Sequence, residues 1–524
     1  MLPNFSTTQV VRKTVIETPH GVVASQHSLA SRVGAEVLAA GGDAVDAAIA
    51  TGFALGVVEP WMSGPAGGGA TTLWRADEGR AYALNFGMRS PAALDVADYP
   101  LTGGPKASDL FPWPAVLDDR NMRGATAVAV PGMVDGMGKL HERFGTMPWA
   151  ELLAPATGMA REGLLLDWFA SLLIASAARN IARDADLAAL FLEDGTWPRV
   201  GNWAAATLAR VDMSGMAATL DGLAAAGARD FYEGDIARAL VGDVQAKGGC
   251  LSMDDLSSYA ADWRDTYSFA RGDTQFHVQP GLTAGPTFGD IFARLPRDGS
   301  TGLPDAGGWK AMADALKGAY EHRIATMGHD GEAPTRPGCT THFSVVDRHG
   351  NMVAHTQTLL SLFGSCVLSP STGLPLNNGV MWFDPEQGKP NSLAPGQPCL
   401  MNICPAIGIT PDGGFAFGAS GGRKIVGAVA QLSHYVADRG MSLEEAFHAP
   451  RIDQSGALLV ADDTIPADVL ETLAAEYEVI DRRRTSYPFA WACTSGVMRR
   501  GGMNSGCTEI MSPWGDALSE ADVA

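Results

Sequence analysis

The most constraining feature of the sequence is a pair of alternating segments separated by a short polar turn. Residues 342–347 (HFSVVD) and 352–358 (MVAHTQT) alternate apolar and polar side chains, which is the pattern of β-strands with two different faces. Between them, Gly350 supplies the left-handed conformation that a three-residue loop of Arg348, His349 and Gly350 requires. The sequence therefore predicts a β-hairpin.

The loop also predicts a register for this hairpin. If Asp347 pairs with Asn351, Thr340 stands opposite Thr358 at the open end. Directly opposed residues in antiparallel strands lie roughly 5 Å apart. Two hydroxyl groups are therefore expected to meet there.

A threonine hydroxyl is a weak nucleophile and requires a base. If the chain is cut before Thr340, the freed α-amine, with an ordinary pKa of about 7.7 to 8.0, is such a base. The same hydroxyl can make the cut, because its attack on the Cys339 carbonyl would convert the peptide into an ester that water hydrolyses. Alone, a Thr-Thr pair at the start of a strand is more often ordinary β-branched strand composition, so this hypothesis depends on the rest of the sequence.

Composition narrows the classes of partner. The chain has 524 residues, 46% of them hydrophobic and 18% charged, which is typical of a globular protein. A formal charge of −20 disfavours nucleic acid and anionic membrane surfaces, so a small molecule is the expected partner. The seven cysteines and eleven histidines are scattered without metal-site spacing, and we expect neither a metal nor another cofactor. We find no signal-peptide pattern or membrane-spanning run, which predicts a cytoplasmic protein.

The rest of the chain divides into recognisable segments. Residues 28–58 have a helical pattern interrupted at Gly41 and Gly42, and the second half is apolar on nearly every face, which predicts a buried helix. Gly67–Gly69 lacks the Gly-Lys-Ser/Thr ending of a phosphate loop, so close packing is the better interpretation. Residues 132–256 are mainly helical, and residues 325–339 have the composition of an exposed, mobile linker.

Several segments together are similar to one enzyme family. They are GGDAVDAAIATGFALGVVEPWMSGPAGGGA, VPGMVDGMGKLHERFGTMPWAELLAPA, FYEGDIARAL, TTHFSVVDRHGNMVAHTQT, LFGS, LPLNN and GASGGRKI. In this order they resemble the γ-glutamyltransferases, and the resemblance extends from about Gly21 to Ser512.

The resemblance implies an α+β fold of the N-terminal-nucleophile hydrolase type, a four-layer αββα sandwich with a helical region in the large subunit. It also implies self-cleavage between Cys339 and Thr340 into a large subunit, residues 1–339, and a small subunit, residues 340–524. The two subunits would remain partners.

The resemblance also assigns catalytic roles. Thr340 matches the family nucleophile, and Thr358 matches the threonine that orients it. Gly421 and Gly422 match the glycines whose backbone amides form the oxyanion hole. Glycine suits that role because no side chain blocks a close approach to the N–H groups.

Three positions of the expected amino-acid clamp depart from the family pattern. Leu360, Gly379 and Trp382 stand where the family has asparagine, glutamine and aspartate. An indole cannot balance a substrate ammonium by charge, although it can face one through a cation–π contact.

Further departures lie in the predicted substrate site. Met401 and Asn402 replace the family's serine pair, and Gly87 stands at the position of the carboxylate-binding arginine, with Arg89 nearby as a possible substitute. Asn378, in the Asn-Asn pair, is the remaining expected substrate-binding residue.

These observations predict a self-processing enzyme that cleaves or transfers the acyl group of γ-glutamyl-like amides through Thr340. The first alternative is an acylase for glutaryl-type or other non-glutamyl amides, because residues 377–396 (NNGVMWFDPEQGKPNSLAPG) resemble the cephalosporin-acylase branch. The second is a homologue that binds amino-acid-like ligands without catalysis, suggested by the altered clamp.

Overall fold

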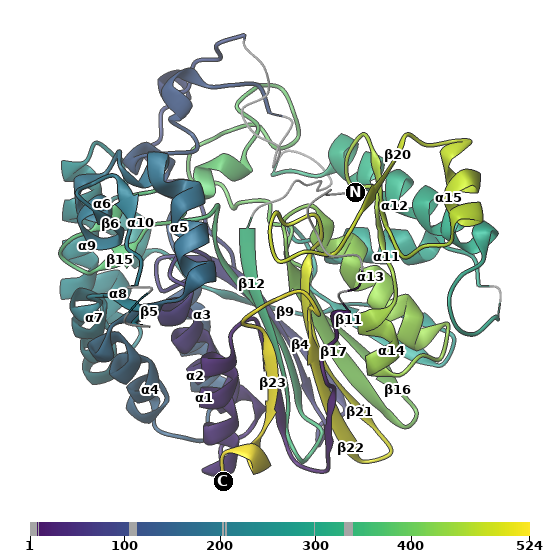
Figure 1. Ribbon diagram of the computed structural model, residues 1–524. Coiled ribbons are helices and arrows are strands. Elements are labelled where there is room, and N and C mark those ends of the chain that lie inside the picture. Colours follow the sequence, from purple (N-terminus) through teal and green to yellow (C-terminus); the bar gives the residue numbers. More distant parts are fainter. Residues whose placement is uncertain are drawn as a thin grey trace.

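The computed structural model describes residues 8, 10–103, 113–201, 204, 207–297, 299–329 and 339–524. Two antiparallel sheets face each other at the centre, and a helical layer covers the outer face of each (Figure 1). Helices from residues 28–257 lie on one side, and those from residues 285–474 on the other. The predicted four-layer αββα sandwich is therefore confirmed. Most of the predicted linker, residues 330–338, lies outside the described residues.

The first sheet contains the predicted hairpin and is called the hairpin sheet. Its seven strands are, in spatial order, β23 (Asp516–Ser519), β2 (Val22–Ser25), β12 (Cys339–Val346), β13 (Met352–Leu360), β3 (Gly68–Arg75), β4 (Arg80–Phe86) and β9 (Asp262–Arg264). Strands from before and after residue 339 are interleaved within it.

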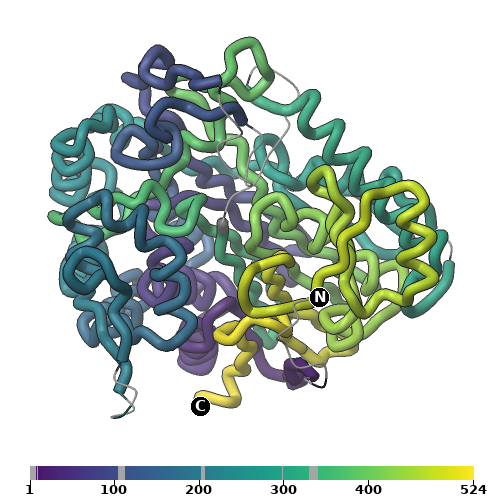
Figure 2. The backbone as a smooth tube through the Cα atoms, turned by 45° about the horizontal axis from the view of Figure 1, so that its top comes forward, coloured from purple at the N-terminus to yellow at the C-terminus, as the bar shows by residue number. Residues whose placement is uncertain are grey.

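The second sheet also has seven strands. In spatial order they are β1 (Ile16–Thr18), β22 (Met503–Thr508), β21 (Cys493–Arg500), β17 (Gly413–Ser420), β16 (Ala406–Thr410), β11 (Thr274–Val278) and β10 (Tyr267–Arg271). Because β1 pairs with β22 and β2 with β23, the first and last segments of the chain run side by side (Figure 2).

The helices outside the hairpin sheet confirm the helical patterns predicted over residues 28–58 and 132–256. They are α1 (Ser28–Ala39), α2 (Ala44–Val58), α3 (Met133–Phe144), α4 (Trp149–Glu162), α5 (Trp168–Ile181), α6 (Ala185–Phe191), α7 (Ser214–Ala226), α8 (Asp230–Glu233), α9 (Asp235–Ala246) and α10 (Met253–Ser257). Outside the second sheet lie α11 (Gly285–Arg294), α12 (Ala306–Thr326), α13 (Lys424–Ala437), α14 (Leu443–His448) and α15 (Ala467–Ala474).

Short strands complete the secondary structure. They form small separate sheets: β5 (Leu164–Leu166) with β8 (Ala209–Val211), β6 (Leu192–Glu193) with β7 (Trp197–Pro198), β14 (Leu368–Ser369) with β15 (Leu374–Pro375), and β19 (Leu459–Asp462) with β18 (Ile452–Asp453) and β20 (Val479–Arg482). Within the described residues, we find no helix both long and apolar enough to cross a membrane.

Helix α2 lies between the hairpin sheet and the outer helices, and all fifteen of its residues are buried, as predicted. Its N-terminus is capped by Asp43, whose side chain accepts hydrogen bonds from the N–H groups of Val45 and Asp46. Asp46 completes a capping box and accepts hydrogen bonds from the backbone of Thr146 and Met147. A carboxylate inside this apolar helix is therefore satisfied by structural contacts.

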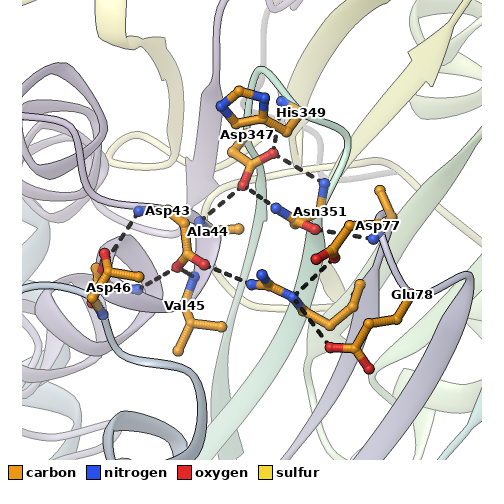
Figure 3. Close-up of polar contacts among 12 residues, drawn as sticks. Asp43, Ala44, Val45, Asp46, Asp77, Glu78, Asp347, His349 and Asn351 are labelled. Carbon is orange, nitrogen blue, oxygen red and sulfur yellow. Dashed lines mark hydrogen bonds and ion pairs between the residues drawn. The ribbon is translucent and has the colours of Figure 1, made fainter.

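The turn of the hairpin is bonded to the N-terminus of α2 (Figure 3). Asp347 Oδ2 accepts a hydrogen bond from the Ala44 N–H at 3.3 Å. Its Oδ1 accepts bonds from the N–H groups of His349 at 2.9 Å and Asn351 at 3.0 Å, which close the turn. One carboxylate thus fixes both the shape of the turn and its position against α2.

Candidate active site

The predicted hairpin is confirmed, and so is its register over most of its length. Asp347 N–H donates to the Asn351 carbonyl at 3.1 Å, and Gly350 has a φ of +88°. The pairing continues to Thr341 opposite Gln357, but it then shifts, because Cys339 pairs with Leu360. Thr340 therefore lies at a bulge-like irregularity at the open end, where the sequence predicts a regular pair with Thr358. Such irregularities re-aim side chains next to active sites.

The Thr340 hydroxyl shares with those of Thr51 and Ser433 a buried position without a hydrogen-bond partner among the described residues. Its side chain is fully buried, and Oγ1 has no hydrogen-bond partner among the residues that the structure describes. An unsatisfied buried hydroxyl costs about 1 to 3 kcal/mol, so native structures keep few of them without a functional reason. Thr340 is therefore a candidate for reaction with its own neighbouring carbonyl.

Thr358 lies on β13 and is held by close backbone packing against β3. It pairs with Gly68 across β13 and β3, and a Cβ on Gly67 would collide with the Thr358 carbonyl oxygen. The glycine run thus serves close packing, as expected. Thr358 Oγ1 accepts a hydrogen bond from the Leu360 N–H at 2.8 Å, and Leu360 has a φ of +86°. A buried leucine in this conformation is strained, and strain of this kind clusters at functional sites.

Gly421 and Gly422 form the turn between β17 and α13. Their φ angles are +125° and +67°, and a Cβ on Gly421 would lie 2.8 Å from Ala492 Cα. Both the backbone conformation and the packing therefore favour glycine. The turn precedes the N-terminus of a fourteen-residue helix, where the helix dipole favours negative charge. This is a suitable place for backbone amides to stabilise an oxyanion.

A hydrogen-bond network joins the start of the hairpin to this glycine turn. Thr341 Oγ1 lies 2.8 Å from Glu59 Oε2 and 3.4 Å from Gln26 Oε1. Gln26 Nε2 donates to Ser420 Oγ at 2.8 Å and to the Cys493 carbonyl at 2.9 Å. Thr341 is the residue after the proposed nucleophile Thr340, and Ser420 is the residue before the oxyanion turn. Both of these neighbours are hydrogen-bonded to Gln26. The structure thus brings these two parts of the predicted site together.

Glu59 and Gln26 lie beside the candidate site, and the sequence analysis missed both. Glu59 is the C-cap residue of α2, and burial raises its pKa to about 8, so the carboxyl is mostly protonated at neutral pH. The available signal was an acidic residue ending an apolar helix, but sequence alone does not show what that residue contacts.

The two histidines of the hairpin are structural in this arrangement. His342 is bonded through Nδ1 to Thr356 Oγ1 at 2.8 Å and through Nε2 to Ser344 Oγ at 3.0 Å. Burial lowers the pKa of His342 well below its usual value and that of His355 to about 3. Both rings are therefore weak bases near neutral pH, which leaves the α-amine of a freed Thr340 as the stronger candidate.

The predicted substrate-binding asparagines are buried and bonded to the protein. The Asn378 amide group donates to the Met122 carbonyl at 3.0 Å and to Ser361 Oγ at 2.9 Å, while its oxygen accepts from the Ser361 N–H. Asn402 Oδ1 accepts from Arg323 at 3.2 Å, whereas Asn402 Nδ2 has no hydrogen-bond partner in the described part of the chain. Asn378 thus supports the loop after Thr358, and Asn402 keeps one free donor.

Arg89 and Trp382 are placed very differently from each other. The Arg89 side chain is exposed, and its guanidinium lies 5.5 Å from the centre of the Tyr259 ring. Trp382 is fully buried at the end of a short 3₁₀ helix, Gly379–Trp382.

Two departures from the family pattern contact each other. A Cβ on Gly87 would lie 2.6 Å from Met401 Cε, so the methionine fills the space beside the glycine. Met401 belongs to an apolar cluster with Met88, Leu360 and Trp382. The positions expected to hold an amino-acid clamp are thus joined by apolar packing.

Within the described residues, we find no group of three or more His, Cys, Asp or Glu side chains arranged to hold a metal ion.

Comparison with known proteins shows which family the chain is similar to. A model of the γ-glutamyltranspeptidase family matches residues 30–336 and 324–510. The acylase ACY 1 proenzyme of Pseudomonas sp. (strain V22) is 32% identical over 492 residues, covering 87% of this chain and 86% of that protein. The glutathione hydrolase proenzyme of Escherichia coli (strain K12) is 29% identical over 496 residues, covering 83% and 81%.

A solved structure extends the similarity to the whole fold. The cephalosporin acylase from Bacillus halodurans matches with a TM-score of 0.83 and 23% sequence identity, covering 99% of both chains. At this level of identity the likeness establishes a common architecture.

Proposed function

The chain belongs to the γ-glutamyltranspeptidase family, and from this premise we propose that it is a self-processing amidohydrolase or acyltransferase with Thr340 as its nucleophile. The observation that carries the proposal is the buried Thr340 hydroxyl without a hydrogen-bond partner in the described structure, at the open end of the hairpin. The hydrogen bonds from Thr341 through Gln26 to Ser420 support it further, because they place this end beside the glycine turn.

Self-cleavage would use the Thr340 hydroxyl and the preceding carbonyl. Thr340 Oγ1 attacks the Cys339 carbonyl carbon, the C–N bond breaks as the amide nitrogen takes up a proton, and an ester remains. Water hydrolyses this ester, which leaves a carboxylate on Cys339 and a free amine on Thr340. The proposed products are a large subunit, residues 1–339, and a small subunit, residues 340–524.

Turnover would repeat this chemistry on an external amide. The Thr340 amine accepts the hydroxyl proton, and the oxygen attacks the substrate carbonyl. The N–H groups of Gly421 and Gly422 stabilise the oxyanion, an effect worth about 3 kcal/mol for each donor. The amine leaves with the proton, and water or an acceptor amine releases the acyl group. Thr358 is proposed to orient the hydroxyl.

A specific observation favours an acyl group without an α-amino group. Classical γ-glutamyl recognition needs a carboxylate for the substrate ammonium and an arginine for its carboxylate, whereas Trp382 is buried in apolar surroundings and Met401 packs beside Gly87. A similar protein carries the name acylase, and we extend that class to this chain. Arg89, Asn378, Trp382 and Asn402 remain the proposed substrate-binding residues, and γ-glutamyl-like amides remain the second candidate.

Denaturing gels and intact-mass measurement test the proposal directly. The purified wild-type protein should give two chains that meet between Cys339 and Thr340, and Thr340→Ala should remain one chain without amidase activity. A wild-type protein that stays whole and inactive would support a non-catalytic binding protein instead. Cleavage that continues in Thr340→Ala would exclude Thr340 as the nucleophile of processing.

A further inference from the structure

Glu59 is a buried carboxyl group with a polar partner on the nucleophile strand. It follows the last residue of α2, and its Oε2 lies 2.8 Å from the hydroxyl of Thr341. Thr341 is itself fully buried, so both partners of this hydrogen bond are removed from water. A buried polar group that loses its hydrogen bond costs free energy, so the two partners are held close to each other.

The hydrogens around Thr341 are sufficient for a relay that starts from a protonated Glu59. Thr341 has one hydroxyl hydrogen, yet two acceptor oxygens lie near it, Glu59 Oε2 at 2.8 Å and Gln26 Oε1 at 3.4 Å. It cannot donate fully to both. If the Glu59 carboxyl is protonated, it donates to Thr341, and the Thr341 hydrogen is free for Gln26.

Gln26 carries this connection into the second sheet. Its amide nitrogen donates to Ser420 Oγ at 2.8 Å and to the Cys493 carbonyl at 2.9 Å, while Ser420 Oγ lies 3.0 Å from Gln26 Oε1. Ser420 and Cys493 are cross-strand partners at the end of β17 and the start of β21. The glutamine thus bridges the two sheets immediately before Gly421.

Helix α2 gives Glu59 a fixed support. Its fifteen residues span roughly 22 Å at 1.5 Å per residue. The strand from Thr341 to Asp347 covers six residue steps, roughly 20 Å. These similar lengths allow the hairpin to be bonded at both ends of the helix, at Ala44 through Asp347 and at Glu59 through Thr341. The position of Glu59 relative to the strand is therefore set by a buried rigid element.

We propose that Glu59 is a positioning residue for the reaction at Thr340. As a neutral carboxylic acid it donates to Thr341, which donates to Gln26, and this relay holds the start of β12 at a fixed position relative to Ser420 and the Gly421–Gly422 turn. The proposal rests on the proposed function of Thr340. Glu59 acts through its neighbours and does not itself react with substrate.

The electrostatics of the site agree with a neutral acid. Burial raises the pKa of Glu59 to about 8, while its bond to Thr341 opposes the shift only in part. The thiol of Cys493 also stays protonated, because burial raises its pKa to about 12. Ionisation of Glu59 would direct the single hydrogen of Thr341 to Glu59 and leave Ser420 Oγ as the donor to Gln26 Oε1.

The experiment compares Glu59→Gln, Glu59→Leu and Thr341→Val with Asp46→Asn as a matched control. Asp46 is a buried carboxylate at the other end of the same helix, and it accepts hydrogen bonds from the backbone N–H groups of Asp43, Thr146 and Met147. A glutamine amide can replace the donor of a protonated glutamate, whereas leucine and valine remove one member of the relay. The deciding readout is the rate of self-cleavage, followed on denaturing gels below the unfolding temperature of each variant.

We expect Glu59→Gln to cleave within about twofold of the wild type, and Glu59→Leu and Thr341→Val to cleave about 10- to 100-fold more slowly. The activity of the mature variants is measured with glutaryl- or γ-glutamyl-p-nitroanilide, whichever the mature wild type hydrolyses. For Glu59→Leu and Thr341→Val we expect kcat to fall while KM changes less than about twofold. Asp46→Asn should lower the unfolding temperature without slowing cleavage, which separates helix stability from positioning.

Three results would overturn the proposal. The first is that Glu59→Leu or Thr341→Val cleaves itself as fast as the wild type. The second is that Glu59→Gln is as slow as Glu59→Leu. The third is that Asp46→Asn slows cleavage as much as Glu59→Leu does. A wild type that is never cut would instead defeat the proposed function of Thr340. The two failures are therefore distinguishable.

Discussion

Met401 occupies the space beside Gly87, because a Cβ on Gly87 would lie 2.6 Å from the methionine Cε. In the γ-glutamyltransferase pattern these two positions belong to the arginine that binds the substrate's carboxylate and to one of a pair of serines. Their replacement by a glycine and a methionine in contact is a matched change, since the longer side chain fills the room that the missing one leaves. The proposed substrate site therefore differs from that pattern at two positions that contact each other.

Acyl preference should follow from Trp382, which stands where the family pattern has an aspartate. We expect glutaryl-p-nitroanilide to be hydrolysed at least about tenfold more efficiently than γ-glutamyl-p-nitroanilide, because a buried ammonium without a carboxylate partner is costly to bind. Comparison of kcat/KM for the two compounds, with and without glycylglycine as acceptor, measures this. A preference for the γ-glutamyl compound would instead show that the substrate ammonium is bound without a carboxylate at position 382, which is Trp382 in this chain.

The Gly87–Met401 contact should also appear as an energetic coupling. Gly87→Ala is expected to destabilise the wild type by about 1 kcal/mol, since the added methyl displaces the methionine end. In a Met401→Ala background the same change should cost less, because the colliding atoms are gone. Urea unfolding of the four proteins in a Thr340→Ala background, which keeps them uncut, gives the coupling. Equal costs in both backgrounds would contradict the contact.

Gly421 should be sensitive to a single methyl group for catalytic reasons. Gly421→Ala places a Cβ 2.8 Å from Ala492 Cα and strains a φ of +125°, so the turn must move. We expect kcat to fall by about 10²-fold or more. Gly440→Ala is the control, because Gly440 also has a positive φ, +68°, but no atom lies within 4 Å of its added Cβ. The control should lose about 1 to 2 kcal/mol of stability and keep its kcat.

Stability should depend on pH through Glu59. Its pKa is raised from 4.5 to about 8 on folding, so the folded chain binds this proton more tightly than the unfolded chain. The contribution is fully present below about pH 4.5, is lost as pH rises towards 8, and amounts to a few kcal/mol on the order-of-magnitude scale. Glu59→Gln removes the titrating group. The difference in unfolding free energy between the two proteins, both carrying Thr340→Ala, should therefore change between pH 5 and 8 and become level above it.

Local pattern was sufficient for the elements but not for the network that joins them. The alternation around Gly350 predicts the hairpin, and the uniformly apolar residues 44–58 predict a buried helix, since both signals lie within one segment. The relay of Glu59, Thr341, Gln26 and Ser420 could not be predicted, because its members come from four separate segments that meet only through tertiary packing. The irregularity at Thr340 is likewise invisible, as no residue type there marks a change of register.

The interleaving of strands in the two sheets has a consequence for how long the two proposed subunits stay together. The hairpin sheet places β12 between β2 and β13, and the second sheet places β11 beside β16, so strands from both sides of residue 339 share backbone hydrogen bonds. If the chain is cut there, the two products are interlocked and cannot separate without breaking both sheets. We expect size-exclusion chromatography to show one species even at nanomolar dilution, and the two chains to exchange with a labelled copy only as fast as the whole molecule unfolds.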